Sequence, residues 1–306
     1  MFEQIVVGVD GGEGGRDAIA LASSLLAREG KLILAHIYGG DPRVHPSGRA
    51  AYEPSKRERT LELLDSTRAE TGVQARLAWG GSSSVGRGLH ELCEAVGADL
   101  LVVGASRRGP LGRVLVGDDT RASLNSARCA VAIAPTGFMN ETVAMREIGV
   151  GYDGSPESEH ALQVARELAA EVGAKVSAFQ APSFSSASVN AATLPLSDSV
   201  DAIVEEARHR IEALGGVEPH AAYGRPAEEL AVYSASLDLL VVGSRGLGPI
   251  GRLIHGSTSQ QLARTARCPL LVLSRAVRAP ETPKAGRNDR RTAPGMKGDR
   301  GDGLDK

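Results

Sequence analysis

Aromatic side chains are scarce in this chain, at 3% of its 306 residues, although hydrophobic residues make up 42%. Its cores must therefore be aliphatic, and it lacks the stacking side chains that hold single-stranded nucleic acid. A net charge of −2 also argues against a protein whose main role is to bind DNA or RNA. The three cysteines are too few and too far apart for a zinc knuckle or a disulfide framework. We expect free thiols in a reducing compartment.

Long apolar runs are absent as well, and nothing approaches the ~18 residues that a membrane span needs. The first residues, MFEQ, lead directly into a strand-like IVVGV without a positive segment, a long apolar core or a small-residue cleavage site. We therefore expect no export signal, no membrane partner and a cytoplasmic location.

An internal repeat is the main feature that the sequence does contain. Residues 98–135 and 237–274 share 14 identities over 38 positions at a constant offset of 139, without a gap. The identical pairs are Asp99/Asp238, Gly104/Gly243, Gly117/Gly256 and Cys129/Cys268, among others. Residues 5–26 likewise resemble 148–169, with Asp10 opposite Asp153. A repeat of about 140 residues is a whole domain, so it indicates duplication and fusion.

Strand and helix patterns alternate within each unit. In the first we expect strands at 4–9, 32–37, 74–79, 99–104 and 130–134, with helices at 15–28, 56–71, 86–97 and 119–127 between them. In the second we expect strands at 147–152, 175–181, 217–223, 238–243 and 270–274. Continuous apolar runs such as LLVVG are typical of strands covered on both faces. The alternation predicts an α/β fold with an open parallel sheet wrapped by helices.

The domain limits follow from the repeat. We expect one domain over 1–137 and a second over 145–275. Residues 276–306 are rich in proline, glycine and charge, and we expect them to be disordered. The serine- and alanine-rich segment 182–199 is interpreted as a mobile loop.

The chemistry-bearing motif lies in the second unit: Gly243, two residues, Gly246, nine residues, then Gly256-Ser257 before a helix. A loop after a parallel strand lies at the carboxyl edge of the sheet, where such folds bind ligands. Glycines let backbone N–H groups approach an anion, and a helix N-terminus favours phosphate. Taken singly, a glycine after a strand is more often a turn, and Ser257 is explained as an N-cap. The complete spacing is far more specific.

Together with Asp153-Gly154-Ser155 after the first strand of that unit, this spacing resembles the universal stress protein family, over nearly all of 1–275. The resemblance implies two doubly wound, Rossmann-like domains with five-stranded parallel sheets of order 3-2-1-4-5, packed as a pseudo-dimer. It also implies binding of ATP, with or without Mg²⁺, and no general catalytic cycle. The residues that it places around ATP are Asp153, Ala181, Val242, Gly243, Ser244, Gly246, Gly256, Ser257, Thr258 and Ser259.

The first unit departs from this pattern. Arg107 stands where Gly246 stands, Asp118 stands where Ser257 stands, and the Asp10 loop lacks the serine. A carboxylate facing phosphate at ~4 Å costs about 1–4 kcal/mol, depending on local screening. We therefore expect nucleotide mainly in the second unit.

No catalytic arrangement is visible. The chain shows no Ser-His-Asp pattern and no G-K-[ST] after the loop, and His255, next to Gly256, is interpreted as a solvated loop residue. We favour an ATP-binding regulatory protein of the stress response, with at most slow ATP hydrolysis. A nucleotide-free interaction module and a nucleotide-dependent enzyme such as an adenylyl transferase remain open, as does a homodimer. Nucleotide that co-purifies with the protein would separate the first two hypotheses, and release of pyrophosphate would favour the third.

Overall fold

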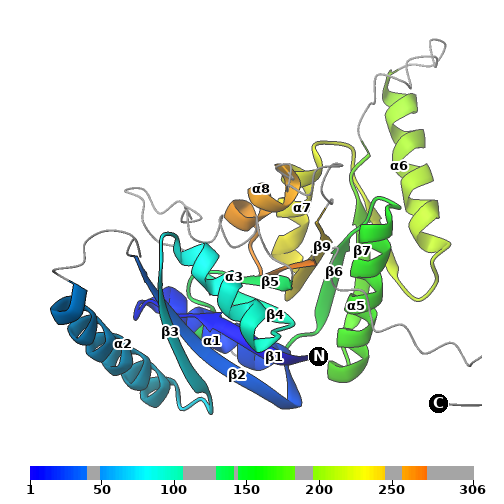
Figure 1. Cartoon of the computed structure of the whole chain (residues 1–306). Helices are drawn as coiled ribbons and strands as arrows, with labels where there is room; N and C mark the ends of the chain where they lie inside the picture. Colours follow the sequence, from blue (N-terminus) through cyan, green and yellow to red (C-terminus); the bar gives the residue numbers. More distant parts are fainter. Residues whose placement is uncertain (40–48, 106–128, 141–143, 183–195, 245–256, 274–306) are drawn as a thin grey trace, which may run out of the picture.

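The computed structural model of the chain describes residues 1–39, 49–105, 129–140, 144–182, 196–244 and 257–273. The strands of the first unit are β1 (Phe2–Gly8), β2 (Leu26–Gly39), β3 (Arg76–Ser82), β4 (Leu100–Gly104) and β5 (Ala130–Ala134). Those of the second are β6 (Glu147–Gly151), β7 (Lys175–Gln180), β8 (Glu218–Ala221), β9 (Leu239–Gly243) and β10 (Leu270–Leu273). They form one sheet of order β3-β2-β1-β4-β5-β10-β9-β6-β7-β8. Figure 1 shows how the strands and helices of the two units are arranged.

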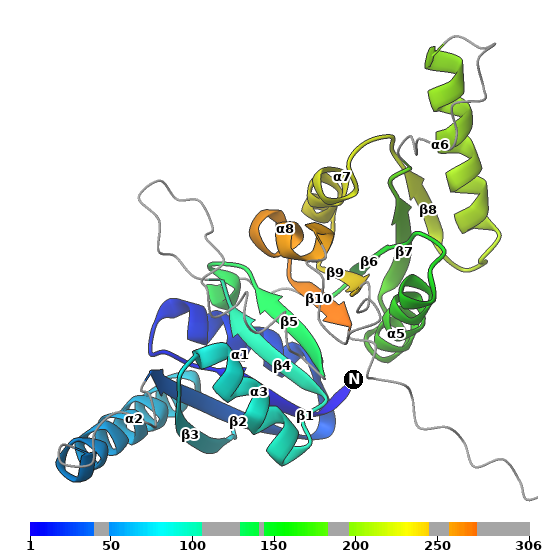
Figure 2. The ribbon, with the colours of Figure 1, turned by 45° about the horizontal axis from the view of Figure 1, so that its top comes forward.

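The helices cover both faces of this sheet (Figure 2). The first unit contains α1 (Glu13–Leu25), α2 (Arg49–Thr71), α3 (Val85–Val96) and the 3-10 turn η1 (Phe138–Asn140). The second contains α5 (Pro156–Val172), α6 (Leu196–Glu212), α7 (Pro226–Tyr233), η2 (Ser234–Ser236) and α8 (Ser257–Thr265). One buried layer takes side chains from α1, α2, α5 and α6, and the other from α3, α7 and α8. No helix in the described ranges is long and apolar enough to cross a membrane.

The first helix of each unit buries one face. In α5 the buried residues Ala161, Leu162, Ala165, Leu168 and Ala169 lie along one face. This helix ends at Gly173, whose φ of +73° is left-handed and whose amide donates to the Ala169 carbonyl.

Two expected segment boundaries differ from the structure. The prediction that the first helix continues to residue 28 is wrong, because Leu26 already pairs with Phe2 in the sheet. The next pair is Gln4 with Lys31, so residues 27–30 form a bulge in β2. The expected loop 182–199 is also too long, since α6 begins at residue 196. The expected helix 119–127 and the tail 276–306 lie outside the described residues.

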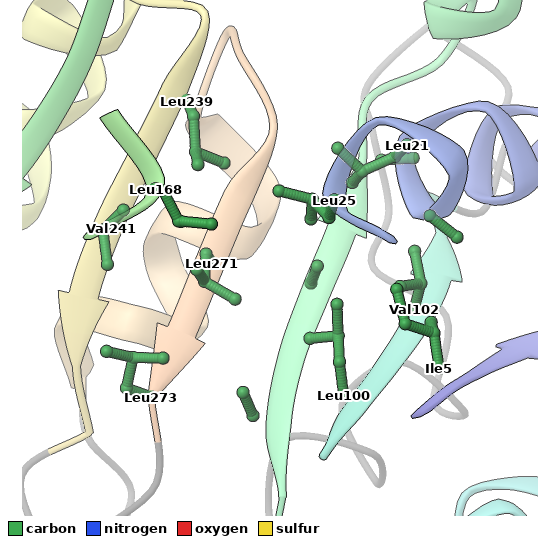
Figure 3. Packing of buried hydrophobic residues seen from close by; sticks show 14 of the residues in the cluster. Ile5, Leu21, Leu25, Leu100, Val102, Leu168, Leu239, Val241, Leu271 and Leu273 are labelled. Atoms are coloured by element: carbon green, nitrogen blue, oxygen red, sulfur yellow. The ribbon is translucent and has the colours of Figure 1, made fainter. Parts of the chain in front are cut away.

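The two units meet through their fifth strands. β10 pairs antiparallel with β5, with Leu270 opposite Ile133, Leu271 opposite Ala132 and Val272 opposite Val131. All these side chains are buried. Each strand would otherwise expose an apolar sheet edge. Figure 3 shows that side chains of both units, among them Leu100 and Leu271, belong to one apolar layer.

The predicted fold class is therefore confirmed. Each unit has strand order 3-2-1-4-5 from its outer edge to the junction, and every pair within a unit is parallel. Whether the two units remain joined in solution stays a prediction.

The Asp99/Asp238 identity of the repeat has a structural explanation. The Asp99 carboxylate accepts hydrogen bonds from the amides of Glu3 at 2.7 Å and Gln4 at 3.1 Å. Asp238 accepts from the amides of Arg146 at 2.7 Å and Glu147 at 2.9 Å. Each aspartate thus ties the turn before the fourth strand to the start of the first strand.

Candidate functional site

The carboxyl ends of three neighbouring strands bring several predicted site residues to one edge of the second unit's sheet. β6 lies between β7 and β9, with Gly151 paired both to Phe179 and to Val242. Asp153, Ala181 and Ser244 follow the ends of β6, β7 and β9 respectively. This edge is where an open parallel sheet binds ligands, so the predicted residues share the expected place.

The backbone around this edge is already hydrogen-bonded within the sheet. The Tyr152 amide donates to the Phe179 carbonyl at 2.9 Å, and the Ser244 amide donates to the Leu273 carbonyl at 2.9 Å. Tyr152 is buried, and burial is the largest of the effects that raise the pKa of its phenol. Val242 is only 4% exposed and lies in the core layer with residues of α7 and α8, so its side chain is part of the core.

Asp153 is held in a hydrogen-bonded turn. Its Oδ1 accepts from the Ser155 amide at 3.1 Å and from the Ser155 hydroxyl at 2.5 Å. Gly154, between them, has a φ of +77°, which a side chain rarely adopts. The Asp153 amide in turn donates to the Ser158 hydroxyl at 3.3 Å. The carboxylate is exposed but fixed in position.

Ser155 is also the N-cap of α5. Its oxygen accepts from the Ser158 amide at 3.3 Å, and Pro156 occupies the first helical position. One hydroxyl therefore caps the helix and holds the Asp153 carboxylate.

The first unit forms the same turn with fewer contacts. Asp10 Oδ1 accepts from the Gly12 amide at 2.9 Å, and Gly11 has a φ of +80°. Gly12 is the N-cap of α1, which has no side-chain cap hydrogen bond. The backbone of the two turns is alike, and the hydroxyl is the difference.

Gly243 has a packing role of its own. A Cβ at this position would lie 2.5 Å from the Glu157 carbonyl oxygen in the first turn of α5. Gly104, its counterpart in the first unit, would place a Cβ 2.0 Å from the Gly14 oxygen. The close approach of the first helix to the end of the fourth strand thus requires glycine in both units, whatever the site binds.

The remaining site residues lie at or before α8. This helix begins at Ser257, and the side chains of Thr258 and Ser259 are half-buried in its first turn. Gly246 and Gly256 lie outside the described residues, as do Arg107 and Asp118 in the first unit. The side chain of Ser257 is likewise outside them.

A polar contact of Tyr233, at the end of α7, was not identified from the sequence. The Tyr233 hydroxyl lies 2.5 Å from Ser177 Oγ, and its ring stacks on Phe179 with centroids 4.8 Å apart. Gly149 makes room for the ring, because a Cβ there would lie 2.8 Å from Tyr233 Cε1. Its counterpart in the first unit is Val6. Glycine in place of this valine is the sequence feature that could have indicated the position of the Tyr233 ring.

Comparison with known proteins assigns the chain to a family. The model of the universal stress protein family matches residues 1–135 and again 145–274. The chain belongs to the universal stress protein family. A universal stress protein of Mycobacterium tuberculosis is 28% identical over 287 residues, which cover 88% of this chain and 96% of the relative. This agreement over both halves matches the predicted tandem organisation.

A solved structure that spans both units agrees on the fold. The crystal structure of a universal stress protein from Archaeoglobus fulgidus superposes with a TM-score of 0.65 at 17% identity, covering 89% of this chain and 98% of the other. A solved universal stress protein in complex with cAMP aligns at 24% identity and a TM-score of 0.32, covering 44% of this chain and 98% of that one.

Proposed function

We propose that this universal stress protein is an ATP-binding regulatory protein of the cytoplasmic stress response, with the nucleotide held mainly by the second unit. The observation that carries the proposal is the glycine spacing from Gly243 to Ser257. This motif begins at Gly243, where β9 ends at the carboxyl edge of the sheet next to β6. It ends at Ser257, the first residue of α8. The backbone N–H groups of such a loop and helix terminus suit phosphate.

The proposed contacts follow the order of the chain. The loop glycines Gly243, Gly246 and Gly256 let the backbone approach the phosphates, and Ser257 adds a hydroxyl at the helix terminus. Ser244, Thr258 and Ser259 complete the phosphate and ribose contacts. Asp153 and Ala181 frame the adenine, and Val242 contributes only backbone. A Mg²⁺ ion, where present, enters with the phosphates.

We assign no catalytic step to these residues. The Asp153 carboxylate, the one acidic group of the proposed site, is occupied by two hydrogen bonds from Ser155. Occupancy by ATP is the proposed signal, and turnover is at most slow.

The direct test is mass spectrometry of any ligand released when freshly purified protein is denatured. Isothermal calorimetry with ATP and GTP then measures affinity, and we expect binding of ATP in preference to GTP. Gly246→Arg, which copies Arg107, should abolish binding because the guanidinium occupies the space that the phosphates need. Val232→Arg is the control, since this α7 side chain is 65% exposed and lies outside the proposed site.

Equal ATP binding by the wild type and Gly246→Arg would remove the proposed site. A wild-type protein that neither carries nor binds nucleotide would favour an interaction module instead. Release of pyrophosphate from ATP would favour an enzyme.

A further inference from the structure

The first helix of each unit carries a polar side chain at the same position, with different partners. The repeat aligns α1 with α5 and places Asp17 opposite His160. Asp17 is 1% exposed, and its carboxylate accepts from the Gly137 and Met139 amides, each at 2.9 Å. The aspartate therefore holds η1, the turn that follows β5, against α1.

His160 has no such partner. Its Nε2 is buried, and among the residues that the structure describes it is the buried side-chain atom without a hydrogen-bond partner. A buried nitrogen that loses its hydrogen bonds to water and gains none from the protein is costly, so such atoms in folded proteins are nearly always paired. The imidazole nitrogen accepts or donates one hydrogen bond, depending on the tautomer. His160 therefore marks a place on α5 that calls for one polar group.

The apolar surface next to this position is also less covered in the second unit. In the first unit Phe138 of η1 is buried in the same layer as Leu21 of α1, which is fully buried. The repeat places Val164 of α5 opposite Leu21, and this valine is only half-buried. Val164 and His160 are four residues apart and share one face of the helix. We call the surface formed by these two side chains the α5 seat.

The chain leaves the fifth strand at the same point of both units. Ala134, the last residue of β5, pairs with Gly104, as Leu273 at the end of β10 pairs with Gly243. Each of these glycines lies against the first turn of its unit's first helix. Figure 3 shows Leu273 in the apolar layer that α5 helps to form. The residues after Leu273 therefore start one strand away from the helix that carries the α5 seat, as η1 does relative to α1.

The sequence that follows β10 suits this seat. At the repeat offset of 139, residues 274–279 (SRAVRA) correspond to 135–140 (PTGFMN), and Val277 stands opposite Phe138. The segment carries two arginines and no acidic residue, whereas α5 carries four glutamates and one arginine. The segment thus offers one large apolar side chain and a charge opposite to that of the helix.

The correspondence fails at one residue. Ala276 stands opposite Gly137, whose φ of +89° alanine rarely adopts. That turn presents two amides to the Asp17 carboxylate. His160 Nε2 makes only one hydrogen bond, so docking at the α5 seat does not require the left-handed turn.

We propose that residues 274–279 dock on the α5 seat of their own chain. Val277 covers Val164, and one backbone group of the segment forms a hydrogen bond with His160 Nε2. For residues 276–279 this proposal replaces the disorder that their composition predicts. It does not depend on nucleotide binding.

Hydrogen–deuterium exchange of the full chain, followed by mass spectrometry of overlapping peptides, measures the docking. After correction for intrinsic rates, the amides of 275–279 should exchange at least about tenfold more slowly than those of 290–300, because docked backbone must open before it exchanges. Val277→Asp should remove this protection, since burying a carboxylate against Val164 is costly. Met296→Asp is the matched control elsewhere in the tail and should leave the protection unchanged.

His160→Ala should also remove the protection of 275–279 and leave the exchange of 137–140 as in the wild type. Asp17→Ala is the matched variant of the first unit and should do the reverse. The exchange of α5 and β10 checks that the His160→Ala protein is folded. Val277→Asp keeps the test decisive if it is not, because residue 277 follows the last strand of the sheet.

Three results would overturn the proposal. One is uniformly fast exchange over 274–306 in the wild type. Another is protection that survives both Val277→Asp and His160→Ala, because the segment would then be held elsewhere. The third is protection that rises with protein concentration, since the segment would then dock on another chain.

Discussion

The Ser155 hydroxyl donates a 2.5 Å hydrogen bond to Asp153 Oδ1, and its oxygen accepts from the Ser158 amide. A single side chain thus joins the predicted ligand turn to the N-terminus of α5. In the first unit Gly12 preserves the backbone part of this arrangement and has no hydroxyl for either contact. The two units consequently differ in stability at this turn, even without a ligand.

Ser155→Ala should lower the free energy of unfolding by about 1 kcal/mol, because the helix loses its N-cap. Gly12→Ser is the converse change and should raise it by a few tenths of a kcal/mol. The Gly12 backbone is extended, so serine adopts it without left-handed strain, although its Cβ would lie 3.1 Å from Asp10 Oδ1 and that carboxylate must shift slightly. Urea denaturation of both variants is the measurement. The capping role would be contradicted if both substitutions changed the free energy of unfolding equally, or if Ser155→Ala stabilised the protein.

Gly243→Ala should destabilise the fold by about 1–3 kcal/mol through overpacking. The added Cβ would lie 2.5 Å from the Glu157 carbonyl, and backbone must shift to relieve that contact. Gly80→Ala in β3 is the matched control, because its nearest neighbour is Ile37 Cδ1 at 3.7 Å. Thermal unfolding compares the two variants. A Gly243→Ala protein as stable as the control would show that this glycine is kept for the ligand alone.

These glycines illustrate what the sequence could and could not predict. The repeat and the strand–helix alternation predicted the fold class, because apolar periodicity is local and its period identifies each element. They did not predict why Gly104 and Gly243 are identical, since the reason is the approach of a helix from elsewhere in the chain. For the candidate site, the sequence identified the edge of the sheet and the turn at Asp153, but not the buried side chain of Val242.

Buried polar side chains were equally unpredictable. Asp17 on α1 is 1% exposed and accepts from the amides of Gly137 and Met139, each at 2.9 Å. It therefore anchors η1, which follows β5. The sequence gives no signal for this contact, because its partners are backbone amides 120 and 122 residues away.

Tyr233 should make stability depend on alkaline pH. Burial raises the pKa of its phenol to about 12 from 10.0, and the Ser177 hydrogen bond acts in the opposite direction. The folded chain thus holds the proton more tightly than the unfolded chain. The contribution of Tyr233 to the free energy of unfolding is complete below pH 10.0 and is lost as the pH rises to about 12.

Tyr233→Phe should abolish this part of the alkaline loss. At neutral pH it should cost about 1–3 kcal/mol, because Ser177 Oγ loses its partner. Urea unfolding between pH 7 and pH 12 is the measurement, and Tyr223→Phe, at a 36% exposed ring, is the control. An unchanged alkaline slope in Tyr233→Phe would show that other groups cause the loss.

The junction between the units predicts one compact body in solution. Leu271→Asp places a charge at a fully buried position opposite Ala132, which should cost at least about 3 kcal/mol. Small-angle scattering should show a larger radius of gyration for this variant than for the wild type. Val232→Asp, on an exposed side chain of α7, should leave both scattering and stability unchanged. Two separate bodies in the wild type would contradict the pairing of β5 with β10.

The degenerate loop of the first unit gives the sharpest test of the proposed nucleotide site. If Arg107 and Asp118 prevent binding there, Arg107→Gly together with Asp118→Ser should install a second nucleotide. Each single change leaves one obstacle in place, the Asp118 carboxylate at the helix terminus or the arginine in the loop. The two substitutions should therefore be non-additive, since they act on one site.

The readout is nucleotide per chain by calorimetry, with about one for the wild type and a rise toward two for the double variant. Adding Gly12→Ser to the double variant should tighten the second site, because the Asp10 turn then gains the hydroxyl that Ser155 supplies to Asp153. The same serine in the wild-type background is the control and should add no second site. A wild-type value near two would show that Arg107 and Asp118 are tolerated in a working site, and the asymmetry between the units would then lie elsewhere.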